Sequence, residues 1–175
     1  ENVKDAERLY QKAISENAVS MKLELVNKAI ELNPLNMEFF LYKAVIHKEL
    51  GQINLVVEEC EKVVKSDTKN LRAYELLGKT HVKLRNYAEA RRAFETILSF
   101  DKNHIGAKLG LAKVLVCEKG YDKALSIYNE IIEMGLENAS AYSGRANVKI
   151  LTNNYISALE DVYKALSLNP EYVKG

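Results

Sequence analysis

The sequence predicts an all-α protein, a stack of five helical hairpins, and three observations support this. First, the two prolines, Pro34 and Pro170, each follow Leu-Asn and are separated by four periods of 34 residues. Second, several columns of residues at this period stay apolar or aromatic along the chain. Third, apolar residues in each repeat recur every three or four positions in two runs of roughly 13 residues, the spacing of helices with one buried face.

The period divides the chain into repeats at 3–36, 37–70, 71–104, 105–138 and 139–172, without insertions. Three columns carry an apolar or aromatic residue in every repeat. The first is Val19, Ile53, Tyr87, Tyr121 and Tyr155. The second is Ile30, Val64, Leu98, Ile132 and Leu166. The third is Ala29, Val63, Ile97, Ile131 and Ala165.

Turn and cap residues follow the same period. Residues that tolerate unusual backbone dihedrals lie between the two runs of a repeat, where a short turn needs them. They are Gly51, Asn86, Gly120, Asn153 and Asn154. Asparagine closes three repeats, at positions 36, 70 and 138. Its side chain accepts hydrogen bonds from the free N–H groups of a helix start, so we expect these three residues to be N-caps.

A 34-residue helical hairpin with small and aromatic residues at fixed places resembles the tetratricopeptide repeat family, over nearly the whole chain. The third repeat matches with Tyr74, Leu77, Gly78, Tyr87, Ala90 and Phe94. The fourth matches with Leu111, Ala112, Gly120, Tyr121, Ala124 and Tyr128, and the fifth with Tyr142, Ala146, Tyr155, Ala158, Ala165 and Pro170. Four departures, Lys22, Lys43, Lys108 and Arg145, are expected to loosen individual hairpins.

The resemblance implies a single domain over 1–175 that curls into a right-handed superhelical array, an α-solenoid. It also implies a concave groove, formed by the first helix of each repeat, where members of the family bind peptide segments of partner proteins. We therefore expect a non-catalytic interaction scaffold with a protein or peptide partner. The family positions that face the groove select Arg72, Glu75, Lys79, Lys83, Leu109, Lys113, Val116, Ser143, Asn147 and Ile150.

These groove residues suggest what the partner carries. Apolar and small residues prevail in the last two repeats, and basic residues in the third. We hypothesise that a segment with apolar anchors lies across repeats three to five, with an acidic group toward Arg72, Lys79, Lys83 or Lys113. The alternative is that these cations only form a solvated face, as helix surfaces usually do. The carboxylate clamp of some co-chaperone members has no match here in any register.

Three glycines, Gly106, Gly110 and Gly144, lie inside predicted first helices, where each costs roughly 1 kcal/mol relative to alanine. One explanation is that the missing side chain lets a ligand backbone approach the groove wall. The other is that the glycine makes room for a bulky neighbour in the stack.

The sequence gives no support for catalysis or for a cofactor. No phosphate-binding loop, nucleophile elbow or HExxH motif is present. His47 and His81 occupy one column and could approach each other, but no third ligand is evident, and a packing role fits better than a metal site. Glu58, Glu59 and Glu61 are expected on a solvated outer face.

Composition limits the partner classes only weakly. The chain has 25 Lys and Arg against 24 Asp and Glu, so net charge favours neither nucleic acid nor a membrane surface. No stretch approaches the roughly 18 apolar residues of a membrane span. Cys60 and Cys117 lack metal-site or disulfide-scaffold spacing and suit a reducing compartment, so we expect a cytoplasmic protein. Because Glu1 is not a start methionine, we expect a module of a longer protein.

Other interpretations stay open. The repeats could present substrates to a larger enzyme or signalling protein, or they could bind RNA, although RNA-binding arrays usually have a longer repeat and a continuous basic groove. The last helix, expected at 155–168, keeps apolar residues on a face that no later repeat covers. That exposure predicts a further helix, a neighbouring domain or self-association through this helix.

Overall fold

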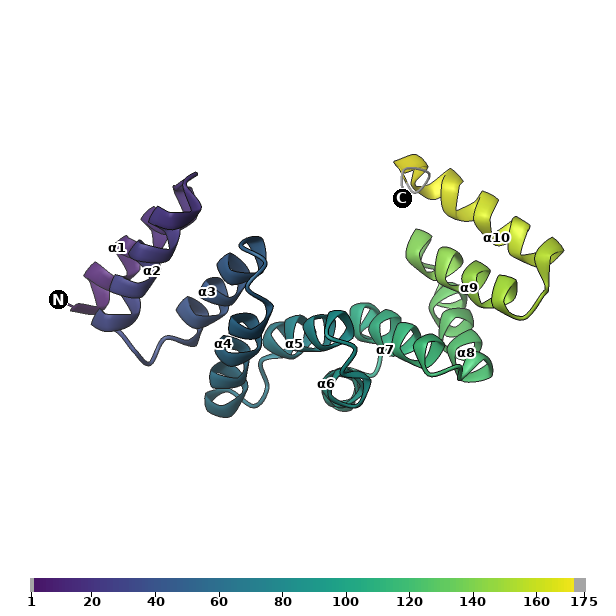
Figure 1. The fold of residues 1–175 in the computed structure, drawn as a ribbon, viewed down its shortest axis with the longest axis horizontal. Coiled ribbons are helices and arrows are strands. Elements are labelled where there is room, and N and C mark those ends of the chain that lie inside the picture. Colours follow the sequence, from purple (N-terminus) through teal and green to yellow (C-terminus); the bar gives the residue numbers. More distant parts are fainter. Residues whose placement is uncertain (1, 172–175) are drawn as a thin grey trace. The chain divides into compact units, whose positions relative to one another are not determined.

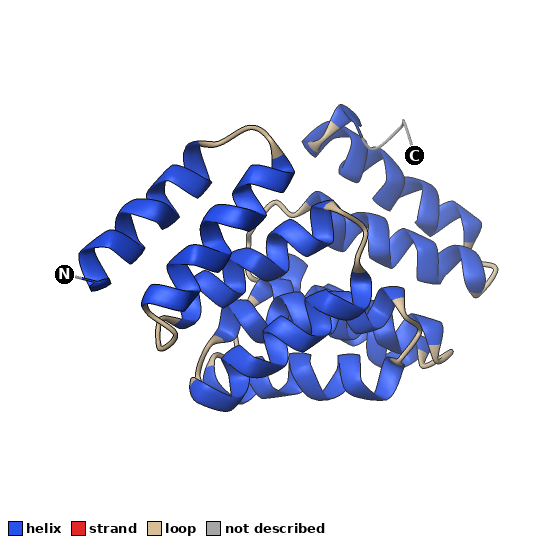
Figure 2. Ribbon diagram, turned by 60° about the vertical axis from the view of Figure 1, so that its left-hand side comes forward, coloured by secondary structure: helices blue, strands red, loops and turns tan. Residues whose placement is uncertain are grey.

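A computed structural model describes residues 2–171, which form ten α-helices and no strand (Figures 1 and 2). The first four are α1 (Asn2–Ser15), α2 (Val19–Leu32), α3 (Met37–Glu49) and α4 (Ile53–Ser66). The next three are α5 (Leu71–Lys83), α6 (Tyr87–Phe100) and α7 (Ile105–Cys117). The last three are α8 (Tyr121–Glu133), α9 (Ala139–Leu151) and α10 (Tyr155–Leu168). Each predicted repeat holds two of these helices, which confirms the all-α class and the hairpin unit.

The chain divides into two compact units, residues 1–81 and 82–175. The division falls near the end of α5, which begins in the first unit. Each unit is described by itself below. The expectation of a single domain over 1–175 stays a prediction.

Unit 1 has two neighbouring apolar clusters. In the first, α3 packs on the hairpin of α1 and α2, where Phe39 and Ile46 join Tyr10 and Val26. In the second, the start of α5 contributes Ala73 and Leu77 to a cluster with residues of α3 and α4. Each hairpin therefore buries its apolar stripe under the first helix of the following repeat, because a lone hairpin has nothing to cover it.

Unit 2 repeats this packing. Helix α7 packs against α6 and α8, and α9 packs against α7 and α8. Its apolar cluster joins Ala112 and Leu115 of α7, Tyr128 and Ile131 of α8, and Val148 of α9. Helix α10 packs on α9 and completes the last hairpin (Figure 1).

Burial follows the predicted columns. The column of Ala29, Val63, Ile97, Ile131 and Ala165 is buried in all five repeats. The neighbouring column, which runs from Ile30 to Leu166, is half-buried throughout. In the column that begins at Val19, the first four residues are half-buried. The last one, Tyr155, is 61% exposed. The period of 34 residues is thus a period in packing.

In the second to fifth repeats the turn between the paired helices has a left-handed residue at one fixed position. Gly51 and Asn153 adopt positive φ there, as the sequence predicted. In the third and fourth repeats the predicted turn residues, Asn86 and Gly120, follow the left-handed residue by one position. The left-handed residues there are Arg85 and Lys119, with φ of 59° and 62°. Asn86 and Gly120 have negative φ and stand at the N-caps of α6 and α8. The position in the turn, more than the residue type, determines the left-handed conformation.

The predicted asparagine caps are confirmed. Asn36 accepts from the backbone N–H of Glu38 at 3.1 Å, and Asn70 accepts from that of Ala73 at 3.0 Å. Asn138 accepts from the N–H of Ala141 at 3.0 Å. His104 occupies the same column, and its Nδ1 accepts from the N–H of Ala107 at 3.1 Å. This fourth cap was not predicted, although His104 stands one period of 34 residues from Asn70 and Asn138.

Candidate functional site

The predicted groove residues divide between the two units. Arg72, Glu75 and Lys79 lie in unit 1, on α5. The other predicted residues lie in unit 2: Lys83, Leu109, Lys113, Val116, Ser143, Asn147 and Ile150. The placement of all ten along one groove stays a prediction.

In unit 1 the predicted cations already have carboxylate partners. Arg72 donates from one guanidinium nitrogen to both carboxylate oxygens of Glu38, at 2.9 and 3.0 Å. Lys79 donates to Glu75 at 2.5 Å, one helical turn away. Both ion pairs are exposed to solvent, so each contributes little to stability. Another carboxylate could therefore replace the glutamate of either pair. An incoming acidic group would have to displace Glu38 or Glu75 at these sites.

In unit 2 two neighbouring first helices carry six of the seven predicted residues. Leu109, Lys113 and Val116 follow one face of α7, and Ser143, Asn147 and Ile150 follow the equivalent face of α9. We call these six residues the first-helix surface. Leu109 and Val116 are half-buried against the core, while Lys113 and Asn147 are exposed. Within residues 2–171, the side chains of Lys113 and Asn147 make no hydrogen bond or ion pair, although both residues lie inside α-helices.

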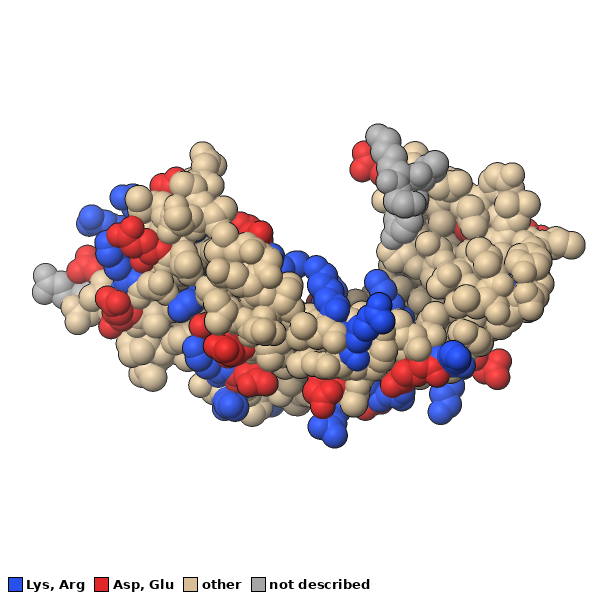
Figure 3. Space-filling view, viewed as in Figure 1, with Lys and Arg blue, Asp and Glu red and all other residues tan. Residues whose placement is uncertain are grey.

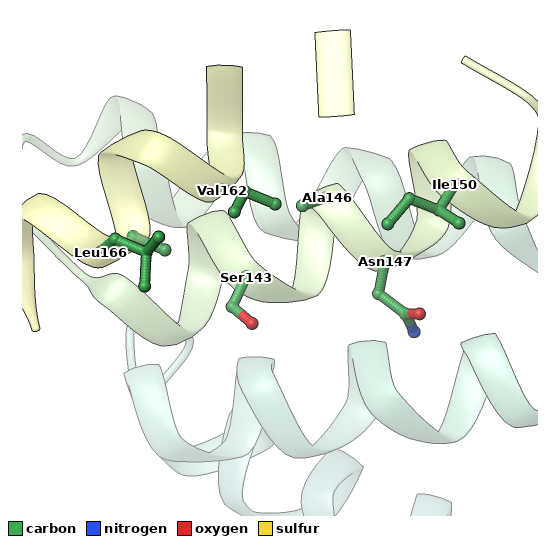
Figure 4. Close-up of a pocket in the computed structure, with 7 residues that line it drawn as sticks. Ser143, Ala146, Asn147, Ile150, Val162 and Leu166 are labelled. Atoms are coloured by element: carbon green, nitrogen blue, oxygen red, sulfur yellow. The ribbon is translucent and has the colours of Figure 1, made fainter. Parts of the chain in front are cut away.

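A pocket of about 210 Å³ adjoins this surface at the last hairpin. Its wall from α9 contains Ser143, Ala146, Asn147 and Ile150, and its wall from α10 contains Val162, Ala165 and Leu166 (Figure 4). Ala146 and Ala165 form its floor, because both are buried, while Ile150 is 45% exposed. The pocket therefore offers an apolar floor with two polar side chains, Ser143 and Asn147, on one side.

Two of the three helix glycines serve packing within the stack. A Cβ atom built on Gly110 would overlap the ring of Phe94, and one on Gly144 would overlap the ring of Tyr128. Both rings come from the second helix of the preceding repeat. These contacts favour the structural explanation for Gly110 and Gly144. Gly106 is half-buried on α7, and its role stays open.

The four residues that depart from the family pattern are each held by a carboxylate. Lys22 lies 3.7 Å from Glu49, and Lys108 donates to Glu130 at 2.6 Å. In the second and fifth repeats the pairing recurs at equivalent positions: Lys43 with Glu59 at 3.5 Å, and Arg145 with Asp161 at 2.6 Å. Each departing residue thus has an acidic partner, and the expected loosening of these hairpins stays a prediction.

Glu59 corrects the expectation of a solvated acidic face. Its side chain is buried, because it faces Lys43 inside the hairpin and also accepts from Lys62 at 3.0 Å. One carboxylate oxygen has no hydrogen-bond donor. Glu58 and Glu61 are exposed, as expected.

The pair of Arg145 and Asp161 belongs to a larger network of hydrogen bonds and ion pairs. Arg145 donates to Asp161 at 2.6 and 2.8 Å and to the amide oxygen of Asn129 at 2.7 Å. Lys149 lies 2.7 Å from the same aspartate. Burial alone would raise the pKa of Asp161, but the hydrogen bonds from Arg145 and Lys149 outweigh it and lower this pKa below its ordinary value.

The two histidines of one column both lie in unit 1 and are buried. His47 shares a 2.6 Å hydrogen bond with Gln52, and the Nδ1 atom of His81 has no partner. Among the described residues, no group of three or more His, Cys, Asp or Glu side chains could hold a metal ion. The cysteines differ: Cys60 is buried and Cys117 is exposed.

Comparison with known proteins agrees with this architecture. A family model described as "Tetratricopeptide repeat" matches residues 71–104, the third of the predicted repeats. The chain therefore contains a tetratricopeptide repeat. It is 30% identical over 115 residues to "Small glutamine-rich tetratricopeptide repeat-containing protein 2" of Mycosarcoma maydis, an alignment that covers 64% of this chain and 33% of that protein. The tetratricopeptide chain described here thus spans about a third of that relative.

Solved structures show the same solenoid fold. MamA 41-end from Desulfovibrio magneticus RS-1 superposes with a TM-score of 0.85 at 14% identity, covering 98% of this chain and 97% of that one. YrrB, titled a TPR protein with an unusual peptide-binding site, superposes with a TM-score of 0.75 at 20% identity, covering 98% and 87%. None of the helices in the described part of the chain has the length and apolarity that crossing a bilayer requires.

Proposed function

We propose that this tetratricopeptide chain is a non-catalytic interaction scaffold, and that its first-helix surface in unit 2 binds a peptide or helix of a partner protein. The observation that supports this proposal most is that exposed polar side chains lie next to apolar side chains on α7 and α9. Lys113 and Asn147 stand at the same position of successive repeats. Leu109, Val116 and Ile150 flank them on the same helix faces.

Such a surface suits a partner segment that combines apolar and acidic groups. Partly exposed apolar side chains supply area that becomes buried on binding, which is the main favourable contribution to association. Lys113 supplies a cation that has no carboxylate partner among the described residues, unlike Arg72 and Lys79 of unit 1. Asn147 can both donate and accept, so it can hold a backbone amide of an extended or helical segment. The proposed binding therefore assigns the acidic group of the partner to Lys113.

An unbiased peptide-display selection on the full chain tests this proposal. We expect enriched peptides to contain Asp or Glu flanked by large apolar residues. Lys113→Ala should weaken binding of an enriched peptide about tenfold, since a hydrogen bond to a charged group contributes roughly 1.5–3 kcal/mol. Lys123→Ala is the matched control, because Lys123 is an exposed lysine on the second helix α8.

Two outcomes of a selection that enriches peptides would contradict the proposal. One is enrichment of peptides whose affinity is unchanged by Lys113→Ala and by Asn147→Ala. The other is equal weakening by Lys113→Ala and Lys123→Ala, which would indicate nonspecific attraction to positive charge. A selection without any enriched peptide would also count against a peptide-binding surface.

A further inference from the structure

Two cations that the sequence assigned to the groove are paired within unit 1, and one of them is held by a different helix. Arg72 of α5 donates to both carboxylate oxygens of Glu38 on α3, which stands 34 residues earlier in the chain. Lys79 pairs with Glu75 of its own helix. In Figure 3 acidic as well as basic side chains lie over α1 to α4, at the left of the view. The first helices of unit 1 therefore supply the anions as well as the cations.

Glu38 is held in place by two other elements besides α5. It lies in the first turn of α3, where the helix N-terminus favours a negative charge. Tyr10 of α1 donates its hydroxyl to a Glu38 oxygen in a long hydrogen bond of 3.4 Å. The Tyr10 ring is buried and packs on Phe39 and Tyr42, with centroid distances of 4.9 and 5.4 Å. Burial, followed by the charge of Glu38, raises the pKa of Tyr10 to about 12, so the phenol keeps its proton at neutral pH.

The pair of Glu38 and Arg72 can open without leaving a buried charge. The Arg72 side chain is 71% exposed and that of Glu38 is 40% exposed. Both hydrogen bonds to Glu38 come from one guanidinium nitrogen. Because an exposed pair of this kind is weak, water or another carboxylate can take the place of Glu38. Glu38 would then still accept from the Tyr10 hydroxyl.

A carboxylate of the same chain competes with those of a partner. Glu38 is already beside Arg72, so its effective concentration there is high. A partner acid that binds Arg72 gains only the difference between its own ion pair and the pair that it breaks. That difference is small, because both are exposed pairs of a carboxylate with a guanidinium group. An acid that binds Lys113 of unit 2 displaces no carboxylate of the described residues.

The pair of Glu38 and Arg72 could instead serve only to brace α3 against α5. Apolar packing already joins these helices, because Ala73 and Leu77 of α5 share a buried cluster with Leu41 and Ala44 of α3. An exposed ion pair adds little to such packing. The position of the pair on exposed surface therefore favours an effect on binding over an effect on stability.

We propose that Glu38 is a specificity-determining residue: as an intramolecular ligand of Arg72, it excludes acidic groups of partner proteins from the first helices of unit 1. Tyr10 is a positioning residue, because it contacts Glu38 and not Arg72. The inference rests on the proposed function in one respect, since it takes the partner to be a peptide segment with acidic groups. The competition at Arg72 does not depend on Lys113.

Parallel peptide-display selections, with one library on the full natural chain and on Glu38→Gln, test this inference. Glutamine keeps the shape of the side chain and removes its charge. We expect the variant to enrich peptides with an Asp or Glu that pairs with Arg72. Adding Arg72→Ala to the variant should weaken these peptides about two- to fivefold, as loss of an exposed ion pair does. They should also bind the natural chain about two- to fivefold more weakly than the variant, whereas peptides from the natural chain should be insensitive to Arg72→Ala.

Two further measurements separate competition from general effects of charge or stability. Glu24→Gln is the matched control, because it removes one carboxylate of unit 1 and frees Lys28 on the second helix α2. It should leave the enriched peptides and their affinities unchanged. In NMR spectra of the free protein, rotation of the Arg72 guanidinium group should be slower in the natural chain than in Glu38→Gln. The melting temperatures of the two proteins should be nearly equal.

Several results would overturn the inference. They are the same peptides with the same affinities for the natural chain and Glu38→Gln, an equal gain in affinity from Glu24→Gln, or equally fast rotation of Arg72 in both proteins. A large fall in melting temperature for Glu38→Gln without new peptides would assign the pair to bracing. If Lys113→Ala has no effect while the dependence on Arg72 appears in Glu38→Gln, only the proposed site in unit 2 fails. The reverse result removes only the role of Glu38.

Discussion

Asp161 joins two cations inside the last hairpin, and its place in the repeat explains why. We number each repeat from its first residue. Positions 7 and 23 then hold an ion pair in the second repeat, Lys43 with Glu59, and in the fifth, Arg145 with Asp161. In the fourth repeat the same positions hold Leu111 and Ile127, which pack on an apolar cluster. An ion pair and an apolar pair are thus two alternative ways of making the same contact between paired helices. A charge at one of these positions requires the opposite charge at the other, because an unpaired buried charge is costly.

Removal of the aspartate charge should therefore destabilise the protein. Asp161→Asn leaves Arg145 and Lys149 without their carboxylate, and we expect the free energy of unfolding to fall by roughly 3 kcal/mol in urea denaturation at pH 7. Arg145→Leu with Asp161→Ile, which copies the fourth repeat, should recover most of this loss. A double variant that is less stable than Asp161→Asn alone would contradict the interpretation of the pair as an alternative to apolar packing.

The same aspartate predicts a pH dependence. Its pKa is lowered in the folded protein, where hydrogen bonds from Arg145 and Lys149 outweigh the effect of burial. A lowered folded pKa adds stability above the ordinary value of about 3.9, and that stability is lost as pH falls through the folded pKa. The difference in unfolding free energy between the natural protein and Asp161→Asn should thus be constant near neutral pH and shrink below about pH 4. An NMR titration that places this pKa above its ordinary value would refute the prediction.

The two thiols should differ in reactivity. Burial, followed by the nearby Glu59 charge, raises the pKa of Cys60 to about 12. At pH 8 only on the order of one Cys60 in 10⁴ is then a thiolate, the reactive form. Iodoacetamide should modify Cys117 and spare Cys60 in the folded protein, and should modify both in denaturant. Mass spectrometry of tryptic peptides distinguishes these cases, and rapid modification of folded Cys60 would show that its surroundings are open.

At the scale of the helix, two glycines stand where the helix contacts a ring of the preceding hairpin. Alanine would gain roughly 1 kcal/mol of helix propensity at Gly110 or Gly144 but would collide with a buried ring. Overpacking typically costs about 1–3 kcal/mol, so we expect Gly110→Ala and Gly144→Ala to lower stability by roughly 1 kcal/mol net. At Gly120 an added Cβ would have its nearest contacts at 3.5 Å, so Gly120→Ala would cause no such collision. Increased thermal stability of Gly110→Ala would contradict this account.

The helices themselves were predictable from sequence, because one period governs apolar spacing, caps and turns together. Asn36, Asn70 and Asn138 were correct as caps, and the buried columns were correct in every repeat. Two errors came from judging residue type without position: the left-handed turn residues Arg85 and Lys119, and the cap His104. The burial of Glu59 was missed because its partner lies on the paired helix, and a helical pattern along one segment does not reveal it.

For the molecule as a whole, binding surfaces were less predictable than the fold. Lys113 and Asn147, which family geometry assigns to the groove, are exposed in unit 2, and their role in binding stays a prediction. Family geometry gave no sign that Arg72 and Lys79 already pair with Glu38 and Glu75, because such pairs depend on rotamers and on residues one repeat away. The pocket at Val162 and Ala165 was also missed.

The central claim is that a partner segment binds across α7 and α9 of unit 2. Methyl NMR of the full chain, titrated with a peptide from the display selection, tests it most directly. The methyl signals of Leu109, Val116 and Ile150 should shift and saturate together, while those of Leu125 and Ile127 on α8 stay in place. Saturable shifts at Leu125 and Ile127, with Leu109, Val116 and Ile150 unchanged, would contradict the claim.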